Sequence, residues 1–151
     1  MPELELKILD SSALEQILAF EQAKLATQIA DEMERELYSW NARWRKESLE
    51  HYLNLGWSFG VWQDQELVGY ALDPPLLFFR GQTQSLWVDQ LSARNLQVTV
   101  KLIECLYRWS RDKHLQTILF SEGESHRSSL ADFGPVRDLE NSIVELRTSR
   151  S

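Results

Sequence analysis

The residue best suited to acid–base chemistry is Asp89, which is the only acidic residue in the apolar segment from Ser85 to Ala93. A carboxylate beside Trp87, Val88 and Leu91 is costly to bury unless a partner or a catalytic task compensates for the lost hydration. A carboxylate held in this way can accept a proton from a substrate in general base catalysis. The alternative is an acid at the edge of a strand that faces water. Asp89 is therefore the candidate catalytic residue.

Other residue types that often perform chemistry are scattered along the chain. His51, His114 and His126 lie far apart in the sequence with no adjacent cysteine, so no metal site is predicted. His126 is a candidate base near the end of a strand, although an exposed histidine at the start of a helix is the simpler interpretation. The single cysteine, Cys105, cannot form an intramolecular disulfide, and its apolar neighbours favour a buried, unreactive thiol.

Length and charge limit the classes of protein to which this chain can belong. Its 151 residues suggest one domain, which we expect at residues 1–146, followed by a polar tail at 147–151. Sixteen Lys and Arg residues against 23 Asp and Glu residues give a net charge of −7, which disfavours nucleic acid and anionic membranes as partners. The sequence has no apolar stretch long enough to span a bilayer and no signal-peptide layout, so we expect a cytoplasmic protein.

The amino-terminal part of the sequence predicts one strand followed by helices. Leu4, Leu6 and Ile8 alternate with other residues, which is typical of a strand. Apolar residues then recur every three or four positions, which is typical of amphipathic helices. The predicted elements are a strand at 4–8, helices from Ser12 to about Thr27 and from Asp31 through Met33, Leu37, Trp40 and Trp44, and a short helix from Ser48 that ends at Gly56.

The rest of the sequence alternates between strands and helices. The polar turn Gln63-Asp64-Gln65 separates two apolar runs and predicts a hairpin. The segment from Ser85 to Ala93 loses strict alternation, so a bulge is expected within it. The further predicted elements are an extension at Leu76–Phe79, a long helix from Asn95 to His114, a strand at Leu115–Phe120, a short helix from Ser125 to Phe133 closed by Gly134, and a hairpin of Val136–Leu139 and Ile143–Leu146 around Glu140-Asn141.

The predicted order β-α-α-β-β-β-α-β-α-β-β is similar to that of the GNAT superfamily of N-acetyltransferases over almost the whole chain. Val61 to Tyr70, with its polar turn and Val-Gly-Tyr run, looks like the second and third strands of the family. The stretch from Leu130 to Gly134 looks like its last helix and the glycine before the final hairpin. The resemblance implies an α/β (α+β), GNAT-like domain with a mixed, mainly antiparallel sheet of about six to seven strands and about four flanking helices.

The resemblance also implies a site for acetyl-CoA as co-substrate. Family members bind it between their fourth and fifth strands, with the pyrophosphate at the start of the following helix. The implied cofactor-binding residues are Leu91, Ser92, Ala93, Arg94, Asn95, Gln97 and Thr99.

The family pattern Arg/Gln-x-x-Gly-x-Gly/Ala is only partly present at this junction. Arg94 matches, whereas Gln97 and Thr99 stand where small residues are usual. A second alignment ends the strand at Ala93, caps the helix with Asn95 and shortens the glycine-rich loop by about four residues. Both alignments lack the glycines.

The resemblance implies an acyl-CoA-dependent N-acyltransferase that acts on a small amine or a peptide amino group, with Asp89 as the base. Leu130 occupies the position where family members carry a tyrosine that acts as the general acid. The general acid of this chain is therefore unassigned. The alternative is a catalytically degenerate GNAT fold that serves as a binding or regulatory module. A homodimer is one candidate assembly.

Four aromatic residues lie in the segment that forms part of the acceptor-site wall in family members, namely Tyr38, Trp40, Trp44 and Trp57. The same apolar spacing suits a core or a subunit contact. The acidic run from Asp31 to Glu34 is explained by a solvated helix start, with an acidic lip for a basic acceptor as the alternative.

Overall fold

The structure is a computed structural model that describes residues 4–40, 42, 44–73, 75–76, 85–121, 126–138 and 143–148. Its helices are the 3-10 helix η1 (Ser11–Ala13) and the α-helices α1 (Leu14–Gln28), α2 (Glu32–Trp40), α3 (Lys46–Leu55), α4 (Leu96–Asp112) and α5 (Arg127–Ala131). Its strands are β1 (Glu5–Ile8), β2 (Phe59–Gln63), β3 (Glu66–Leu72), β4 (Pro75–Leu76), β5 (Ser85–Val88), β6 (Gln90–Ala93), β7 (Thr117–Phe120), β8 (Val136–Asp138) and β9 (Val144–Arg147). The predicted α/β fold class is confirmed.

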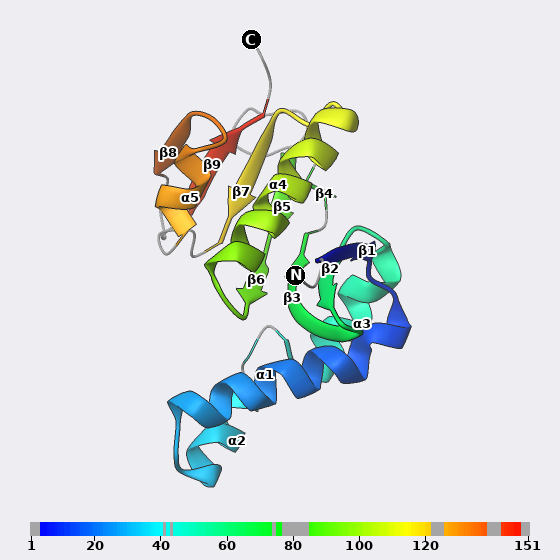
Figure 1. Cartoon of the computed structure of the whole chain (residues 1–151), viewed down its shortest axis with the longest axis vertical. Coiled ribbons are helices and arrows are strands. Elements are labelled where there is room, and N and C mark those ends of the chain that lie inside the picture. Colours follow the sequence, from blue (N-terminus) through cyan, green and yellow to red (C-terminus); the bar gives the residue numbers. More distant parts are fainter. Residues whose placement is uncertain are drawn as a thin grey trace.

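The strands form two sheets (Figure 1). The first has the order β1-β2-β3-β6 and is antiparallel throughout. The second has the order β4-β5-β7-β9-β8, in which β5 and β7 form the one parallel pair among the described strands. We expected a single sheet, but the segment from Ser85 to Ala93 is interrupted at Asp89, so β5 belongs to one sheet and β6 to the other. A break at Asp89 thus stands where a bulge was predicted, and it divides the sheet.

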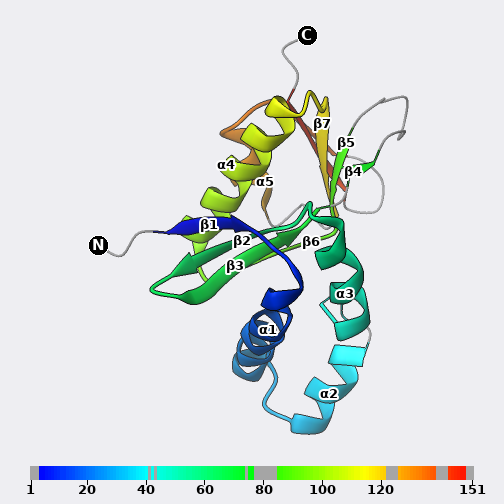
Figure 2. The same cartoon turned by 90° about the vertical axis from the view of Figure 1, so that its right-hand side faces the viewer.

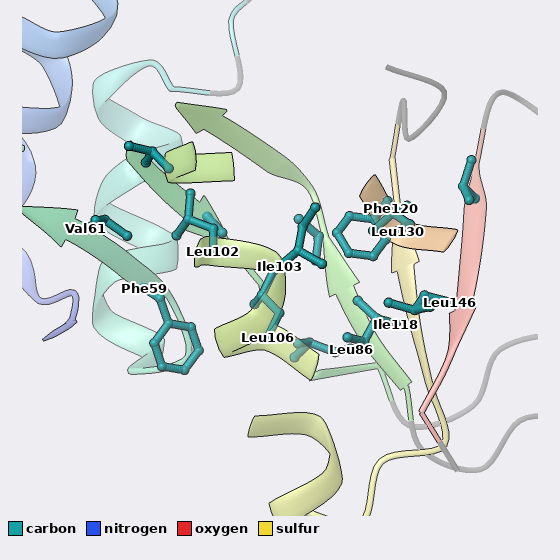
Figure 3. Close-up of a cluster of buried hydrophobic side chains, with 14 of the residues drawn as sticks. Phe59, Val61, Leu86, Leu102, Ile103, Leu106, Ile118, Phe120, Leu130 and Leu146 are labelled. Atoms are coloured by element: carbon teal, nitrogen blue, oxygen red, sulfur yellow. The ribbon is translucent and has the colours of Figure 1, made fainter. Parts of the chain in front are cut away.

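The helices cover the two faces of the first sheet. Figure 2 shows α4 on one side of β2 and β3 and α1 on the other. The larger core lies on the α4 side and joins both sheets, as Figure 3 shows for Phe59, Leu102, Ile118 and other buried side chains. A smaller core on the α1 side packs Ile17 and Leu49 with residues of β3.

Local chemistry explains where these elements begin and end. The β2–β3 turn has Asp64 and Gln65 at φ of 52° and 68°, the left-handed conformation that two-residue hairpins need. Gly56 ends α3 at φ of 74°, as its position predicted. Gly69 lets α4 approach β3, because a Cβ there would lie 2.5 Å from Cγ1 of Val98.

The second predicted helix is shorter than expected, and its apolar face is not buried. α2 ends at Trp40, and Trp44 lies beyond it, buried in the smaller core. Met33, Leu37 and Trp40 are instead 69%, 50% and 61% exposed, because no described element packs on that side of the helix. Helical periodicity alone therefore placed Trp44 on the wrong element.

Several end positions also differ from expectation. His126 is the residue that precedes α5, and the predicted cap Ser125 lies outside the described residues. The turn at Glu140-Asn141 and the residues after Leu76 in the predicted extension to Phe79 also lie outside them. At the carboxyl end, β9 includes Arg147, and Thr148 is buried with its hydroxyl donating to the Leu115 carbonyl (2.7 Å), so ordered structure continues into the segment expected to be a tail.

The longest helix among the described residues is α4, with 17 residues. None of the helices there combines the length and the apolar character that crossing a bilayer requires.

Candidate active site

The candidate site lies where β6 and β7 separate. β5 pairs with β7 from Ser85–Thr117 to Val88–Phe120, and the Ser121 N–H donates to the Val88 carbonyl (3.0 Å). Beyond this point, the described part of the chain gives β6 only β3 as a strand partner. The separation predicted near Ala93 therefore begins earlier, at Asp89.

This separation leaves one edge of β6 open. The Arg94 N–H donates to the Val68 carbonyl (2.8 Å), so the backbone groups of Arg94 and of Ser92, two residues earlier, face β3. Since successive residues of a strand direct their backbone groups to alternate edges, Leu91 and Ala93 direct theirs toward the open side. An extended ligand with amide groups can pair with such an edge.

Asp89 lies at the point of separation and is held by its neighbours. Its N–H donates to the Leu72 carbonyl (2.9 Å), which ties it to the end of β3. Its Oδ2 accepts a hydrogen bond from the Tyr52 hydroxyl (2.6 Å), and its Oδ1 lies 3.4 Å from Nε1 of Trp87. Asp89 is half-buried, so the structure favours a positioned carboxylate over a strand-edge acid in water. Tyr52 was not foreseen, because the sequence contains no signal that brings α3 to this strand.

The start of α4 provides backbone donors close to the open edge. Asn95 caps the helix, as predicted, and its Oδ1 accepts from the Val98 N–H (3.0 Å). The Thr99 N–H and hydroxyl both donate to the Asn95 carbonyl, at 3.1 and 3.2 Å. The N–H groups of Leu96 and Gln97 precede these and have no partner within the helix. An anion at this end would bind them or compete with the Asn95 side chain for Val98.

Arg94 and Ser92 direct their side chains away from this helix end. The Arg94 guanidinium lies 2.5 Å from Oε1 of Gln63 and 3.7 Å from a carboxylate oxygen of Glu66, at the β2–β3 turn. The Ser92 side chain is buried, and its hydroxyl accepts a hydrogen bond from Nζ of Lys24 on α1 (2.8 Å). Within the predicted set, the structure thus groups Leu91, Ala93, Asn95 and Gln97 at the opening.

A buried polar pair secures α1 to the sheet beside the site. The Tyr70 hydroxyl donates to Oε1 of Glu21 (2.7 Å), and both residues are buried. Burial raises the pKa of Tyr70 well above its usual value, and the charge of Glu21 and the hydrogen bond to it act in the same direction. The Tyr70 phenol therefore stays protonated and keeps donating at physiological pH.

Comparisons with known proteins were made by sequence and by structure. No protein-family model and no curated protein matches the sequence. The structure is similar to PaiA N-acetyltransferase from Thermoplasma acidophilum in complex with coenzyme A, with a TM-score of 0.69 and 15% identity, covering 96% of this chain and 99% of that chain. This chain has the GNAT fold.

Two further structures with this fold cover nearly all of the chain. An acetyltransferase of the GNAT family from Staphylococcus aureus Mu50 has a TM-score of 0.66 and 14% identity, covering 97% of this chain and 100% of that one. N-acetylglutamate synthase from Neisseria gonorrhoeae, complexed with coenzyme A and N-acetyl-glutamate, has a TM-score of 0.65 and 12% identity, covering 98% of this chain and 36% of that one.

The last helix of this GNAT fold offers no acid at the position examined in the sequence. Leu130 is fully buried in the larger core with Phe120 and Leu146 (Figure 3). Of the neighbouring hydroxyls, Ser128 is exposed and Ser129 is buried. The phenol closest to Asp89 is instead Tyr52, at hydrogen-bonding distance.

His126, for which the sequence favoured an exposed position, is more buried than expected. It is half-buried at the start of α5, and its pKa is lowered by burial first and then by the charge of Lys24. His51 and His114 are exposed. Burial raises the pKa of Cys105 to about 12, which agrees with an unreactive thiol. No cluster of three or more metal-ligating residues occurs within the ranges that the structure describes.

The aromatic residues expected near the acceptor site do not form one wall. Tyr38 and Trp40 are exposed on α2, and Trp44 is buried in the smaller core. Trp57 packs edge-to-face against Trp109 of α4, with ring centroids 5.9 Å apart. Trp44 and Trp57 therefore agree with the interpretation of this spacing as core, whereas Tyr38 and Trp40 do not.

Proposed function

We propose that this chain is an acyl-CoA-dependent N-acyltransferase that uses acetyl-CoA and modifies a small amine or a peptide amino group. The observation that carries the proposal is the separation of β6 from β7 at Asp89 within a GNAT fold. Two structures with this fold, among those compared, contain coenzyme A. The open edge of β6 leads directly into the start of α4, which supports one extended ligand contacting both.

The residues at the opening suit the two ends of such a co-substrate. The backbone groups of Leu91 and Ala93 would pair with its amides, and the N–H groups of Leu96 and Gln97 would face its phosphates at the positive end of α4. The Asn95 cap already occupies the Val98 N–H, so the phosphate contact has fewer donors than a glycine-rich loop provides. When bound, the co-substrate supplies an acyl group activated as a thioester.

Asp89 would prepare the acceptor for this transfer. An amine attacks a thioester only in its neutral form, and Asp89 would take the proton from the ammonium directly or through water. Tyr52 donates to one of the carboxylate oxygens and so fixes its orientation, which makes it a positioning residue. The departing thiolate of coenzyme A would take its proton from solvent.

Calorimetric titration with acetyl-CoA, coenzyme A, pantetheine and adenosine 3′,5′-bisphosphate tests the proposal. We expect the whole coenzyme to bind more tightly than either part, since the strand edge and the helix start each hold one part. An absence of heat at millimolar coenzyme would contradict the transferase function and would favour a binding or regulatory module.

A matched pair of variants tests whether a negative charge weakens coenzyme binding only when it lies at the start of α4. Gln97→Glu places a negative charge at the start of α4, where it stabilises the helix but repels phosphate. Gln28→Glu makes the same change at an exposed residue at the end of α1. We expect Gln97→Glu to weaken coenzyme binding by about tenfold, as expected for roughly 1.4 kcal/mol, and Gln28→Glu to leave it unchanged.

A further inference from the structure

A second hollow lies on the other side of the first sheet, between α1 and the β2–β3 hairpin. It has a volume of about 660 Å³, within the range of small-molecule sites. Phe20 and Ala23 of α1 form one wall, and Leu67 of β3 and Ala93 of β6 form the other. Two cations, Lys24 and Arg94, and one acid, Glu66, also line it. Figure 2 shows α1 running along this face of β2 and β3.

Lys24 is the unusual residue in this pocket. Its ammonium is half-buried and donates to the neutral hydroxyl of Ser92, and no acidic residue in the described ranges forms an ion pair with it. A partly buried charge normally has a partner of opposite charge. The absence of one here stands out because the protein has a net charge of −7 and acidic residues are plentiful.

The two cations of the pocket differ in their partners. Arg94 is balanced by Glu66 and bonded to Gln63, so it is already partnered. The charge of Lys24 instead acts on His126, whose pKa it lowers in addition to the effect of burial. The ammonium thus lies close enough to the start of α5 for its charge to act on His126.

We propose that this pocket binds an apolar carboxylate, with the carboxylate paired to Lys24 and the apolar group against Phe20 and Leu67. The pairing would supply the missing counter-charge, and the apolar walls would exclude small inorganic anions as the preferred ligands. This inference deepens the proposed transferase function, because the pocket adjoins β6 and its ligand would be the acceptor.

The position of the pocket sets the length of such an acceptor. Ser92, which holds Lys24, lies three residues from Asp89, or about 10 Å along a strand. A dipeptide spans about 7 Å from amine to carboxylate. A dipeptide with its carboxylate at Lys24 and its chain along β6 would direct its amine toward Asp89. A short peptide with a free carboxyl end and an apolar last residue fits both ends.

Glycyl-leucine and its carboxamide test this assignment by calorimetry and by NMR mapping. The two differ only in the charge at the carboxyl end. We expect glycyl-leucine to bind about tenfold or more tightly than glycyl-leucinamide, as is typical when a charge-assisted bond is lost, and to perturb the amide signals of Phe20, Lys24 and Ala93. Equal binding of the two, binding of neither, or perturbation confined to other residues would overturn the assignment.

A matched pair of variants identifies Lys24 as the source of the preference. Lys24→Gln removes the charge but keeps a donor for Ser92, whereas Lys46→Gln makes the same change at an exposed residue of α3. Only the first is expected to abolish the preference for the carboxylate. Retention of the preference in Lys24→Gln would refute the role of this residue.

His126 provides a readout that does not depend on catalysis. Its imidazole signals should titrate with a lowered pKa in the free protein and move toward the ordinary value in saturating glycyl-leucine or in Lys24→Gln, because each removes the effect of the charge. His51 and His114 serve as internal references. Arg127, the exposed cation on the same helix, is present in every sample and so does not account for a difference between samples. An unresponsive His126 would contradict the inference. Binding of coenzyme without binding of dipeptide would refute this acceptor and leave the transferase proposal standing.

Discussion

β5 and β6 are two halves of one extended segment, and they have opposite surroundings. β5 lies between β4 and β7 and buries Leu86 and Val88 completely or nearly so. β6 pairs only with β3 among the described strands and is half-exposed on its other edge. The one residue between them is Asp89, and the two strands belong to different sheets. A single interruption thus separates a fully paired strand from an open edge and places an acid at the junction.

The largest effect is expected from removing the acid at this junction. Asp89→Asn keeps the side-chain shape and the backbone bond to Leu72 but removes the base. We expect kcat to fall by about 10²–10⁴, measured as thiol release from acetyl-CoA with an acceptor that supports turnover. Tyr52→Phe, which removes one hydrogen bond to the carboxylate but keeps the carboxylate itself, should reduce kcat less and leave the KM for acetyl-CoA unchanged. A full rate in Asp89→Asn would mean that the junction serves geometry alone.

The next largest effect is a loss of stability, which we expect to differ between a leucine of β5 and a leucine of β6. Leu86 of β5 is fully buried in the larger core, whereas Leu91 of β6 is half-buried against it. Leu86→Ala should lower the free energy of unfolding by about 2–5 kcal/mol, and Leu91→Ala by clearly less. Thermal unfolding measures both, at roughly 2–4 °C per kcal/mol for a chain of this size. Equal losses would show that β6 is as tightly packed as β5.

A pH-dependent effect is expected beside the junction, at the end of β3. Asp73 is completely buried, and neither of its oxygens has a hydrogen-bond partner among the described residues, so burial raises its pKa well above the ordinary value. The folded protein therefore holds this proton, and the free energy of unfolding falls as the pH rises from about 4 toward the raised pKa.

Asp73→Asn replaces this carboxyl by a neutral group of the same shape. We expect the variant to unfold at a higher temperature than the native protein at neutral pH, and the difference to disappear below about pH 4, where the native carboxyl is protonated in both states. Calorimetry between pH 4 and 8 measures the trend. Asp132→Asn, at an exposed residue, is the control and should leave the pH profile unchanged. A pH-independent difference would indicate packing rather than ionisation.

The fold was predictable from the sequence because its signals are local. Asn95 before a long apolar face and Gly56 after a short one marked helix ends correctly, and the polar turn at Gln63–Gln65 marked a hairpin. The length of α2 was not predictable, because Trp44 fits a helical spacing with Trp40 as well as it fits the smaller core. Periodicity does not reveal whether a partner exists for an apolar face.

The candidate site was predictable only in part. Asp89 stood out because an acid in an apolar strand is costly, and the junction with α4 followed from the order of elements. Tyr52 and Lys24 did not stand out, since their roles depend on contacts across 37 and 68 positions of sequence, with Asp89 and Ser92. Tertiary contacts of that kind leave no trace in the composition or spacing of a single sequence.

The smallest effect is expected at the far end of the open half, where β6 leads into α4. Asn95→Ala removes the cap, which should lower the free energy of unfolding by about 1 kcal/mol. The same change releases the Val98 N–H that Asn95 now occupies, so coenzyme A should bind as tightly as before or a few-fold more tightly. Thermal unfolding and calorimetric titration of the same samples measure the two effects. Weaker binding would show that the Asn95 side chain itself contacts the coenzyme. The residue that caps α4 would then also be a ligand of the phosphate.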